Sequence, residues 1–336
     1  MENTNRQSIN NSPLNKPPKK LPNWLLSWES FLFGIAVIIF IVNSIASPYF
    51  LNPWSLSDAT FNFTEKAIIA LPLALVIIVR EIDISVASII ALSSTAMGFA
   101  AQSGSGVFVI CLVGMAVGTL CGMFNGLLVT RLNIPSIVVT IGTMSLFRGI
   151  TFILLGDQAL RNYPESFSYF GQGYVFWVIS FEFTCFLVLA ALFYVLLQKT
   201  NFGRKTYAIG NNPTAAYYSG IDVKKHKLIL FTLVGFFCGV ASIMLTSRLG
   251  STRPTIAFGW ELSIITMVVL GGVSILGGSG TILGVVISVF VMGLVTVGLG
   301  LLNVPGIVMS IIIGCMLISV IALPRALKLI KHSLKV

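Results

Sequence analysis

The chain carries ten apolar runs, and this feature restricts its fold more than any other. Most of the runs approach the roughly 20 mainly apolar residues that an α-helix needs to cross a bilayer. Only 10% of the residues are charged, against about 25% in an ordinary soluble domain. The sequence therefore predicts an all-α integral membrane protein with about ten transmembrane helices. The runs cover residues 30–47, 64–79, 84–101, 107–130, 134–155, 174–197, 228–247, 261–277, 281–301 and 304–323.

Lys and Arg are distributed unevenly between the segments that join these runs. When the N-terminus is placed in the cytoplasm, the inside segments hold about four times as many basic residues as the outside segments. The outside basic residues are then Lys66, Arg161, Arg248 and Arg253. Because cytoplasmic loops of membrane proteins carry an excess of Lys and Arg, we expect both termini to be cytoplasmic.

This topology divides the chain into three parts. Residues 1–28 are polar and are expected to form a disordered cytoplasmic tail. Residues 29–325 form the transmembrane domain, whose long loop 198–227 is cytoplasmic, and residues 326–336 form a basic cytoplasmic tail. The net charge of +10 does not indicate nucleic-acid binding, because the sequence has no basic patch interleaved with aromatic residues. We attribute the excess of Lys and Arg to the cytoplasmic loops.

An internal repeat lies in the apolar part of the chain. Residues 132–141 read LNIPSIVVTI and residues 302–311 read LNVPGIVMSI, with six of ten positions identical. A weaker similarity relates residues 83–86 to residues 261–264. The copies are five predicted spans apart, and an odd number of spans reverses orientation. The sequence therefore predicts an inverted internal repeat, a plan common in transport proteins.

The loop 198–227 contains a signal for a short helix. Asn212 provides a side chain that can cap a helix, and Pro213 suits the first helical position. Gly220 provides a stop a few residues later. We expect a helix of one or two turns outside the membrane, which could dock into a cleft of a cytoplasmic partner or be an ordinary surface helix.

Three motifs, at residues 82–88, 210–221 and 270–284, resemble a known family, the sugar permeases of ATP-binding-cassette importers. Residues 210–221 resemble the cytoplasmic coupling segment of these permeases, and residues 82–88, IDISVAS, are similar to their I-D-L-S-V-G-S motif. Residues 270–284 are similar to their glycine-rich stretch near the C-terminus. The motifs follow the order found in the family, and the resemblance covers roughly residues 30–325.

The resemblance implies the ribose-type permeases, which include those for xylose, rhamnose and autoinducer-2. It implies an inner-membrane subunit that pairs with a second permease subunit, identical or paralogous, with two cytoplasmic ATPase subunits and with an external solute-binding protein. It places the contact with the ATPase at Asn212, Ala215, Ala216, Tyr217, Tyr218, Ser219 and Gly220. Departures at Arg80, Glu81, Ala87 and the two tyrosines favour the rhamnose and autoinducer-2 branches.

The chain has no phosphate-binding loop of its own. The motif G-x-x-x-x-G-K-[ST] is absent, and this motif supplies the lysine that holds ATP phosphates. We expect no cofactor on this chain, with ATP bound by the partner subunits. We do not expect an enzyme, since His226 and His332 lie beside lysines and are expected to be solvated.

Charged residues close to the membrane interior require an explanation, because centring one in a spanning helix costs about 2.5–3.5 kcal/mol. They either line and brace the translocation path or serve structure alone, with Asp83 capping a helix and Arg148 in a salt bridge or reaching to the surface. Glu182 is a further charge within an apolar run. The candidates for the path are Asp83, Ser85, Ser88, Arg148 and Glu261.

The glycines near the C-terminus allow two interpretations. They can let helices approach closely, or they can belong to a broken helix whose backbone faces the path. The residues concerned are Gly271, Gly272, Gly277, Gly278, Gly280 and Gly284.

Three alternative functions stay open at this point. A branched-chain amino-acid permease of the same superfamily shares the architecture. An ion-coupled secondary transporter would also explain an inverted repeat. A membrane-embedded enzyme lacks support, because the sequence contains no clustered His, Asp or Cys residues.

Overall fold

The computed structural model describes residues 27–333, with side chains of the last helix as far as Ser319 and that of Ala322. The predicted tail 1–28 lies outside the described residues except for its last two positions. Of the predicted basic tail 326–336, the last three positions lie outside them. The helices and strands are α1 Trp28–Ala46, α2 Pro53–Ile78, α3 Val86–Gln102, α4 Val107–Arg131, α5 Ser136–Leu155, η2 Glu165–Ser168, α6 Tyr169–Gln172, β1 Tyr174–Phe176, β2 Ile179–Ser180, α7 Phe181–Lys199, α8 Asn201–Asn211, α9 Pro213–Tyr218, α10 Val223–Leu249, α11 Trp260–Leu270, α12 Ile282–Leu301 and α13 Gly306–Ser333.

The helices of the described chain confirm an all-α membrane fold. Seven of them are long and apolar enough to cross a membrane, namely α1, α2, α4, α5, α7, α10 and α12. Three shorter apolar helices accompany them, which are α3, α11 and the Gly306–Ser319 part of α13. Each of the ten apolar runs of the sequence coincides with one of these helices.

Two of the runs are not helical throughout. The run 174–197 begins with a small antiparallel hairpin, β1–β2, and α7 starts only after Ser180, whose side chain caps it. The run 261–277 is helical only as far as Leu270, because two glycines follow and Gly272 takes a left-handed φ of 85°. Helix α11, at 11 residues, is about 16 Å long. It therefore covers about half of the ~30 Å hydrocarbon layer.

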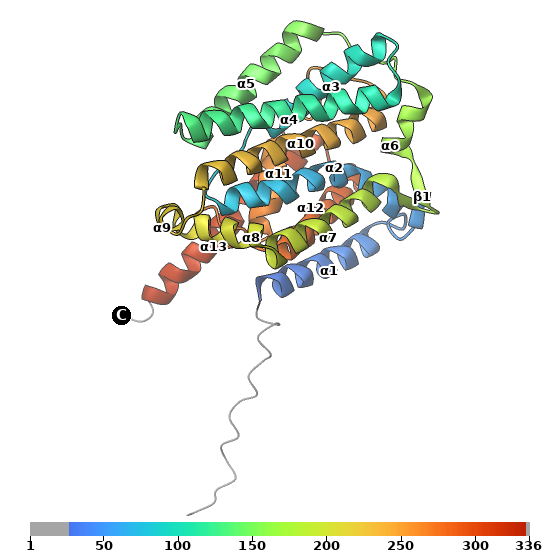
Figure 1. Cartoon of the computed structure of the whole chain (residues 1–336). Helices are drawn as coiled ribbons and strands as arrows, with labels where there is room; N and C mark the ends of the chain where they lie inside the picture. Colours follow the sequence, from blue (N-terminus) through green and yellow to red (C-terminus); the bar gives the residue numbers. More distant parts are fainter. Residues whose placement is uncertain (1–26, 334–336) are drawn as a thin grey trace, which may run out of the picture.

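Successive membrane helices run in alternating directions. The first residue of α1, Trp28, donates from its indole nitrogen to the carbonyl of Leu270 at the end of α11, at 2.9 Å. The amide of Gly278, which precedes α12, donates to the carbonyl of Ile78 at the end of α2, at 2.9 Å. The start of α1, helix α9 and the end of α13 all lie at one end of the bundle (Figure 1). We call this the α9 end.

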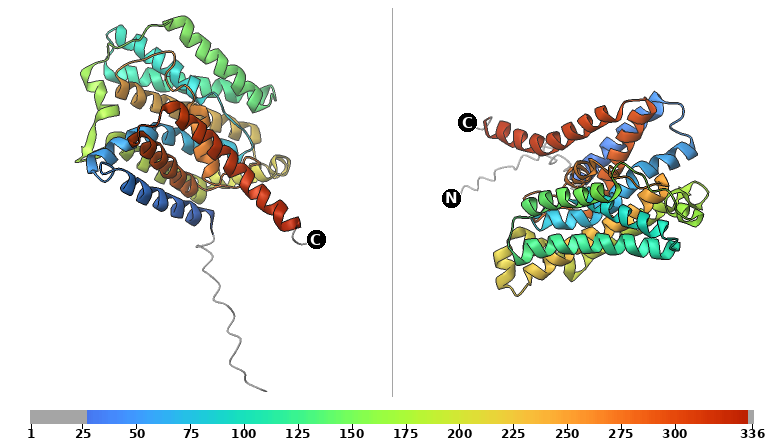
Figure 2. Two further views of the ribbon diagram at one scale, coloured as in Figure 1. Left: turned by 180° about the vertical axis from the view of Figure 1, so that it is seen from behind. Right: turned by 90° about the horizontal axis from the view of Figure 1, so that it is seen from above.

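The two copies of the internal repeat have the same local structure. Asn133 and Asn303 each follow the end of a long helix and take left-handed φ values of 53° and 55°. In each copy a proline comes two residues later, and the next helix starts directly after it, at Ser136 in α5 and Gly306 in α13. Helix α5 starts at the α9 end and α13 ends there (Figures 1 and 2). The two copies therefore have opposite orientations, as the odd number of spans predicts.

The halves of the molecule also exchange packing partners. Helix α2 of the first half packs on α12 of the second, and α10 of the second half packs on α4 of the first. The α4–α10 contact depends on glycine, since a Cβ at Gly118 or Gly122 would overlap the backbone around Gly235 and Gly239. Small residues permit this close approach in membranes. Helix α2 lies at the centre and is buried over most of its length, whereas α1 is largely exposed.

Candidate functional site

The predicted short helix in the loop 198–227 is present. Helix α9 begins at Pro213, and the Asn212 side-chain oxygen accepts a hydrogen bond from the Ala215 amide at 3.0 Å. Gly220 ends the segment with a left-handed φ of 83°. The local prediction of a capped helix with a glycine stop is therefore confirmed.

Helix α9 presents aromatic side chains to its surroundings. Tyr217 and Tyr218 are 66% and 83% exposed and contact each other edge to face. Asn212, Ala215, Ser219 and Gly220 are also exposed, whereas Ala216 is only 5% exposed. All the proposed ATPase-contact residues except Ala216 are therefore accessible on one short segment.

A groove of about 540 Å³ lies beside the two tyrosines. Its walls come from α9, from the start of α10 and from the linker between α4 and α5. Charges of both signs line it, and an ion pair between Lys227 and Glu81 joins α10 to the α2–α3 linker there. The groove gives the α9 end a concave, mainly apolar surface with charged residues in its walls, next to exposed aromatic rings.

Helix α8 was not predicted from the sequence. Thr200 caps it, accepting a hydrogen bond from the Phe202 amide at 3.1 Å. Gly203 and Gly210 let the helix fold back closely, since a Cβ on Gly203 would meet the backbone of Leu197 and one on Gly210 would meet that of Ile78 and Gly278. Thr200 is a recognisable helix cap in the sequence, whereas the two glycines lower the helix propensity of this segment.

Helix α8 joins the α2–α3 linker to the glycine-rich motif 270–284. Arg80 donates from Nε to the Gly210 carbonyl at 2.6 Å and from Nη2 to the Asn211 carbonyl at 2.6 Å. The Tyr207 hydroxyl donates to the Gly280 carbonyl at 2.6 Å, and burial raises the pKa of this hydroxyl, which keeps its proton in place. We call this set of contacts, between Arg80, α8 and residues 277–280, the junction.

The C-terminal glycines form the loop between α11 and α12 rather than a break within a long helix. Gly272, Gly277, Gly278 and Gly280 have left-handed or otherwise positive φ values, which side-chain-bearing residues rarely adopt. Gly271 and Gly284 lie against each other, since a Cβ on either would overlap the backbone of the other's segment. The glycines thus permit both a tight loop and a close contact of α11 with α12.

Asp83, Ser85 and Ser88 lie in the linker 79–85 and the first turn of α3, and all three are fully buried. Asp83 Oδ1 accepts hydrogen bonds from the Ser85 amide at 2.9 Å and the Ser85 hydroxyl at 2.6 Å. The Asn125 side chain of α4 donates to the Ser85 hydroxyl at 2.8 Å. These contacts brace the start of α3 against α4.

Arg148 fastens a second irregular linker, residues 250–259, which joins α10 to α11. Its guanidinium donates to the carbonyls of Pro254 at 2.7 Å and Ile256 at 2.8 Å, and to that of Ala87 in α3 at 3.2 Å. Glu261, partly buried in the first turn of α11, is close enough to attract Arg148 electrostatically. The same helix, α5, holds the linker 79–85 through hydrogen bonds of Ser136 and Thr140 to the backbone of Ile82.

Comparison with known proteins identifies the family. The model of the family described as branched-chain amino acid transport system / permease component matches residues 55–321. The chain belongs to this family. No solved structure matches the chain.

Relatives in this family are similar over nearly their whole length. The permease is 35% identical to the ribose import permease protein RbsC of Bacillus subtilis (strain 168), over 87% of this chain and 91% of the relative. It is 31% identical to the D-allose transport system permease protein AlsC of Escherichia coli (strain K12), over 91% and 95%. It is 33% identical to the autoinducer 2 import system permease protein LsrD of Escherichia coli O9:H4 (strain HS), over 92% and 94%.

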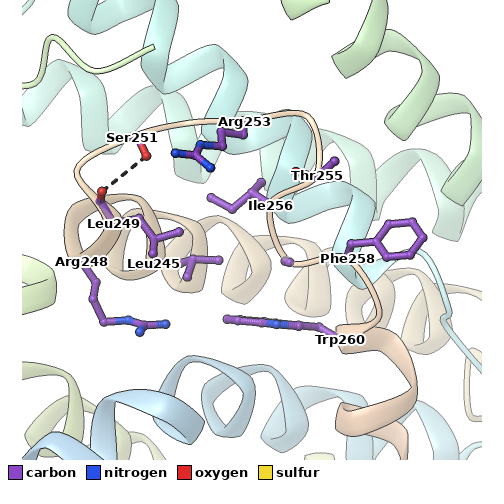
Figure 3. A pocket seen from close by; sticks show the side chains of 10 residues that line it. Leu245, Arg248, Leu249, Ser251, Arg253, Thr255, Ile256, Phe258 and Trp260 are labelled. Atoms are coloured by element: carbon purple, nitrogen blue, oxygen red, sulfur yellow. Dashed lines mark hydrogen bonds between the residues drawn. The ribbon is translucent and has the colours of Figure 1, made fainter. Parts of the chain in front are cut away.

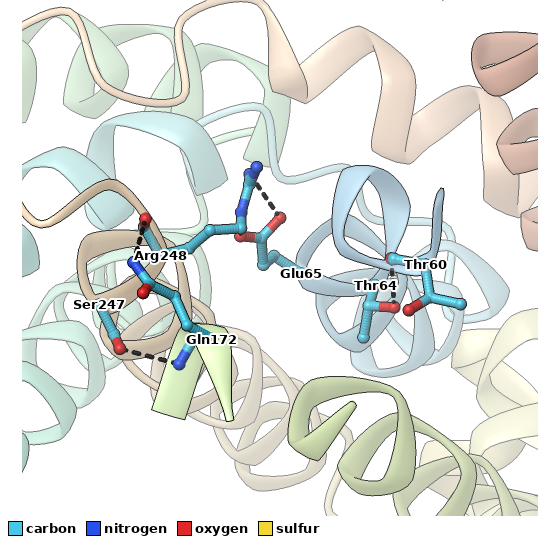
Figure 4. A network of polar contacts seen from close by, with 7 residues as sticks. Thr60, Thr64, Glu65, Gln172, Ser247 and Arg248 are labelled. Atoms are coloured by element: carbon cyan, nitrogen blue, oxygen red, sulfur yellow. Dashed lines mark hydrogen bonds and ion pairs between the residues drawn. The ribbon is translucent and has the colours of Figure 1, made fainter. Parts of the chain in front are cut away.

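The permease also has a buried charge cluster that was not predicted from the sequence (Figure 4). Arg248 at the end of α10 binds Glu65 of α2 through two hydrogen bonds, at 2.7 and 3.2 Å, and the Glu65 side chain is fully buried. Glu182 lies near both groups, and its carboxylate has no hydrogen-bond partner among the described residues. The sequence predicts Glu182 to be a charge within an apolar run and Arg248 to lie in an outside segment. No sequence pattern indicates that Arg248, Glu65 and Glu182 lie close together.

His226 is buried, whereas the sequence predicts a solvated side chain. It is 6% exposed, its Nε2 is 2.9 Å from the Thr206 hydroxyl, and its ring packs on Phe202. The reason is that α8 folds back over the first turn of α10 and covers the imidazole.

Proposed function

We propose that this protein is the membrane-spanning permease subunit of an ATP-binding-cassette importer for a sugar or sugar-like solute. The observation that carries the proposal is that relatives 31–35% identical over most of the chain import ribose, allose and autoinducer 2. The substrate is therefore of the same class, which includes rhamnose and xylose. The family description names branched-chain amino acids, but these relatives favour the sugar alternative.

The other subunits of such an importer are the proposed partners of this chain. Two ATPase subunits dock at the α9 end, which is cytoplasmic together with both termini, and the exposed tyrosines of α9 enter a cleft of the ATPase. A second permease subunit, identical or paralogous, completes the path in the inner membrane. An external binding protein delivers the solute to the opposite end. ATP is bound by the ATPase subunits and by none of the residues of this chain.

The contacts of the junction support a coupling of the ATPase subunits to the conformation of the permease. Movement of α9 pulls α8, since the two helices are separated only by Asn212. Helix α8 is bonded to Arg80 and to the glycine loop, which is residues 271–281 between α11 and α12, and this loop begins directly at the end of α11. Differential binding of the ATPase in its two nucleotide states would then shift the permease between outward-facing and inward-facing states.

The experiment that tests this function is uptake by a strain in which only this chain is deleted. Labelled ribose, allose, xylose, rhamnose, autoinducer-2 and leucine are offered in parallel, with and without the chain restored from a plasmid. We expect restoration of uptake for one or more of the sugars or autoinducer-2 and no change for leucine. Restoration of leucine uptake alone would instead assign the branched-chain amino-acid function.

A further inference from the structure

A cavity of about 470 Å³ lies between the last turns of α10, the linker 250–259 and the start of α11 (Figure 3). It lies away from the α9 end, because α10 starts beside α9 and reaches the cavity only after about 22 of its residues, or some 33 Å. The cavity is lined by Leu245, Arg248, Leu249, Ser251, Arg253, Thr255, Ile256, Ala257, Phe258 and Trp260.

The cavity is lined by backbone that is not helical although it lies within a membrane bundle. Helix α11 reaches only about 16 Å from the glycine loop, so residues 250–259 cross the remaining depth without forming a helix. Ala257 in this linker even takes a left-handed φ of 56°. Irregular backbone at membrane depth is tolerated where it is packed in protein or lines a water-filled cavity. The linker meets both conditions, since Thr252 is packed in protein and other linker residues line the cavity.

The lining has the chemistry that suits a neutral polyhydroxylated solute. Trp260 offers an aromatic face for the C–H face of a sugar ring, while Arg248 and Arg253 offer several N–H donors for hydroxyl oxygens. Ser251 and Thr255 add hydroxyl groups. None of the residues lining the cavity is acidic, so no lining carboxylate would form an ion pair with the ammonium group of an amino acid.

Two walls of the cavity are held in place by charged side chains of α2, of which Glu65 is buried and Lys66 is partly buried. Glu65 fixes Arg248 through its bidentate pair, which leaves the Arg248 side chain 24% exposed. The Lys66 ammonium lies 4.8 Å from the centre of the Trp260 ring. Figure 3 shows the Trp260 ring edge-on, with α2 beneath it, the Arg248 guanidinium beside it and residues of the linker above. One face of the indole is therefore occupied by α2, and the opposite face is turned toward the cavity.

The linker itself is held as firmly as the walls. Arg148 binds the carbonyls of Pro254 and Ile256, and the Thr252 hydroxyl contacts those of Ser94 and Tyr163 at 2.6 Å each. A cavity whose walls are fixed before the solute arrives does not need to be ordered by binding.

From this geometry we infer that the cavity is a solute-binding subsite of the permease, in which Trp260 stacks on a neutral polyhydroxylated solute and Arg248 and Arg253 donate to its hydroxyls. The inference rests on the proposed function and deepens it, since it names the residues that the solute touches during passage.

The first test compares variants of Trp260 in the assembled importer. Uptake is measured for the solute found in the deletion-strain experiment, together with the amount of complex in the membrane. We expect Trp260→Leu to lower uptake at least roughly tenfold and Trp260→Phe, which keeps an aromatic face, to retain most of it. Trp54→Leu is the matched control, because Trp54 is a half-exposed tryptophan of α2 outside the cavity, and we expect no change. Wild-type uptake by a normally assembled Trp260→Leu variant would overturn the inference.

A second test does not depend on transport. In a Cys315→Ser background, which removes the exposed thiol of the described chain, Thr255→Cys is treated with a membrane-impermeant thiol reagent. We expect a saturating concentration of the same sugar to slow modification, while leaving that of the exposed control Ser103→Cys unchanged. Equal rates with and without sugar at position 255 would overturn the inference. The proposed function would fail separately, if the wild-type chain restored uptake of none of the sugars.

Discussion

Arg80 joins two parts of the permease that are far apart in sequence. It takes a left-handed φ of 67° and donates two charged hydrogen bonds to α8, each of a kind that contributes about 1.5–3 kcal/mol. We expect Arg80→Ala to lower uptake by roughly tenfold or more and to leave ATP hydrolysis by the complex uncoupled from transport. Uptake and hydrolysis are measured on the same vesicles. Arg131→Ala removes an exposed arginine at the same end and serves as the control; equal effects of the two substitutions would contradict the junction.

Asp83 is predicted to act as a brace. Asp83→Asn keeps an oxygen for the Ser85 amide and hydroxyl, whereas Asp83→Ala leaves both donors buried without an acceptor, at a cost of about 1–3 kcal/mol each. We therefore expect the alanine variant to unfold at a clearly lower temperature in detergent than the asparagine variant. The exposed Asp157→Ala should match the wild type. A wild-type unfolding temperature for Asp83→Ala would show that the brace contributes nothing.

The sequence predicts those features of single residues that depend on neighbours along the chain. Asn212, Pro213 and Gly220 give a cap, a start and a stop within ten positions, so the short helix could be predicted. The pairing of Glu65 with Arg248 and the reach of Arg80 to Gly210 bridge more than a hundred positions. No pattern of residue types specifies such pairs, because they depend on how the helices pack.

Helix α8 connects the exposed helix α9 to the junction. Its Gly210 lies against the backbone of Ile78 and Gly278, so even one added methyl group would push α8 off the glycine loop. We expect Gly210→Ala to reduce uptake severalfold although alanine is about 1 kcal/mol better than glycine in a helix. Uptake is compared with that of Gly142→Ala, whose Cβ would meet no atom within 4 Å. Uptake at the wild-type level in Gly210→Ala would show that the close contact is dispensable.

The number and order of membrane helices could be predicted because each apolar run must satisfy its backbone within itself. The length of α11 could not, because residues 271–277 are apolar or small and still form a loop. Composition measures compatibility with lipid, whereas the end of the helix is set by glycines that pack against α8 and Trp28. The same limit explains why residues 174–180 were expected to be helical.

Across the whole molecule, one continuous series of contacts connects α9 with the cavity. It passes from α9 to α8, through the junction to the glycine loop, and along α11 to Trp260, which lies on the cavity. Helix α5 holds the linkers at both ends of this series through Ser136 and Arg148. The inverted repeat places these two linkers in equivalent positions of the two halves, each after a long helix that packs on the other half.

We propose that an ATPase on other chains drives solute through this permease. The most direct test is accumulation of the labelled solute in proteoliposomes that contain the complete importer, with binding protein outside and ATP inside. We expect accumulation that requires ATP and persists when ionophores abolish every ion gradient. Accumulation by this chain alone, driven by an ion gradient and indifferent to ATP, would contradict it.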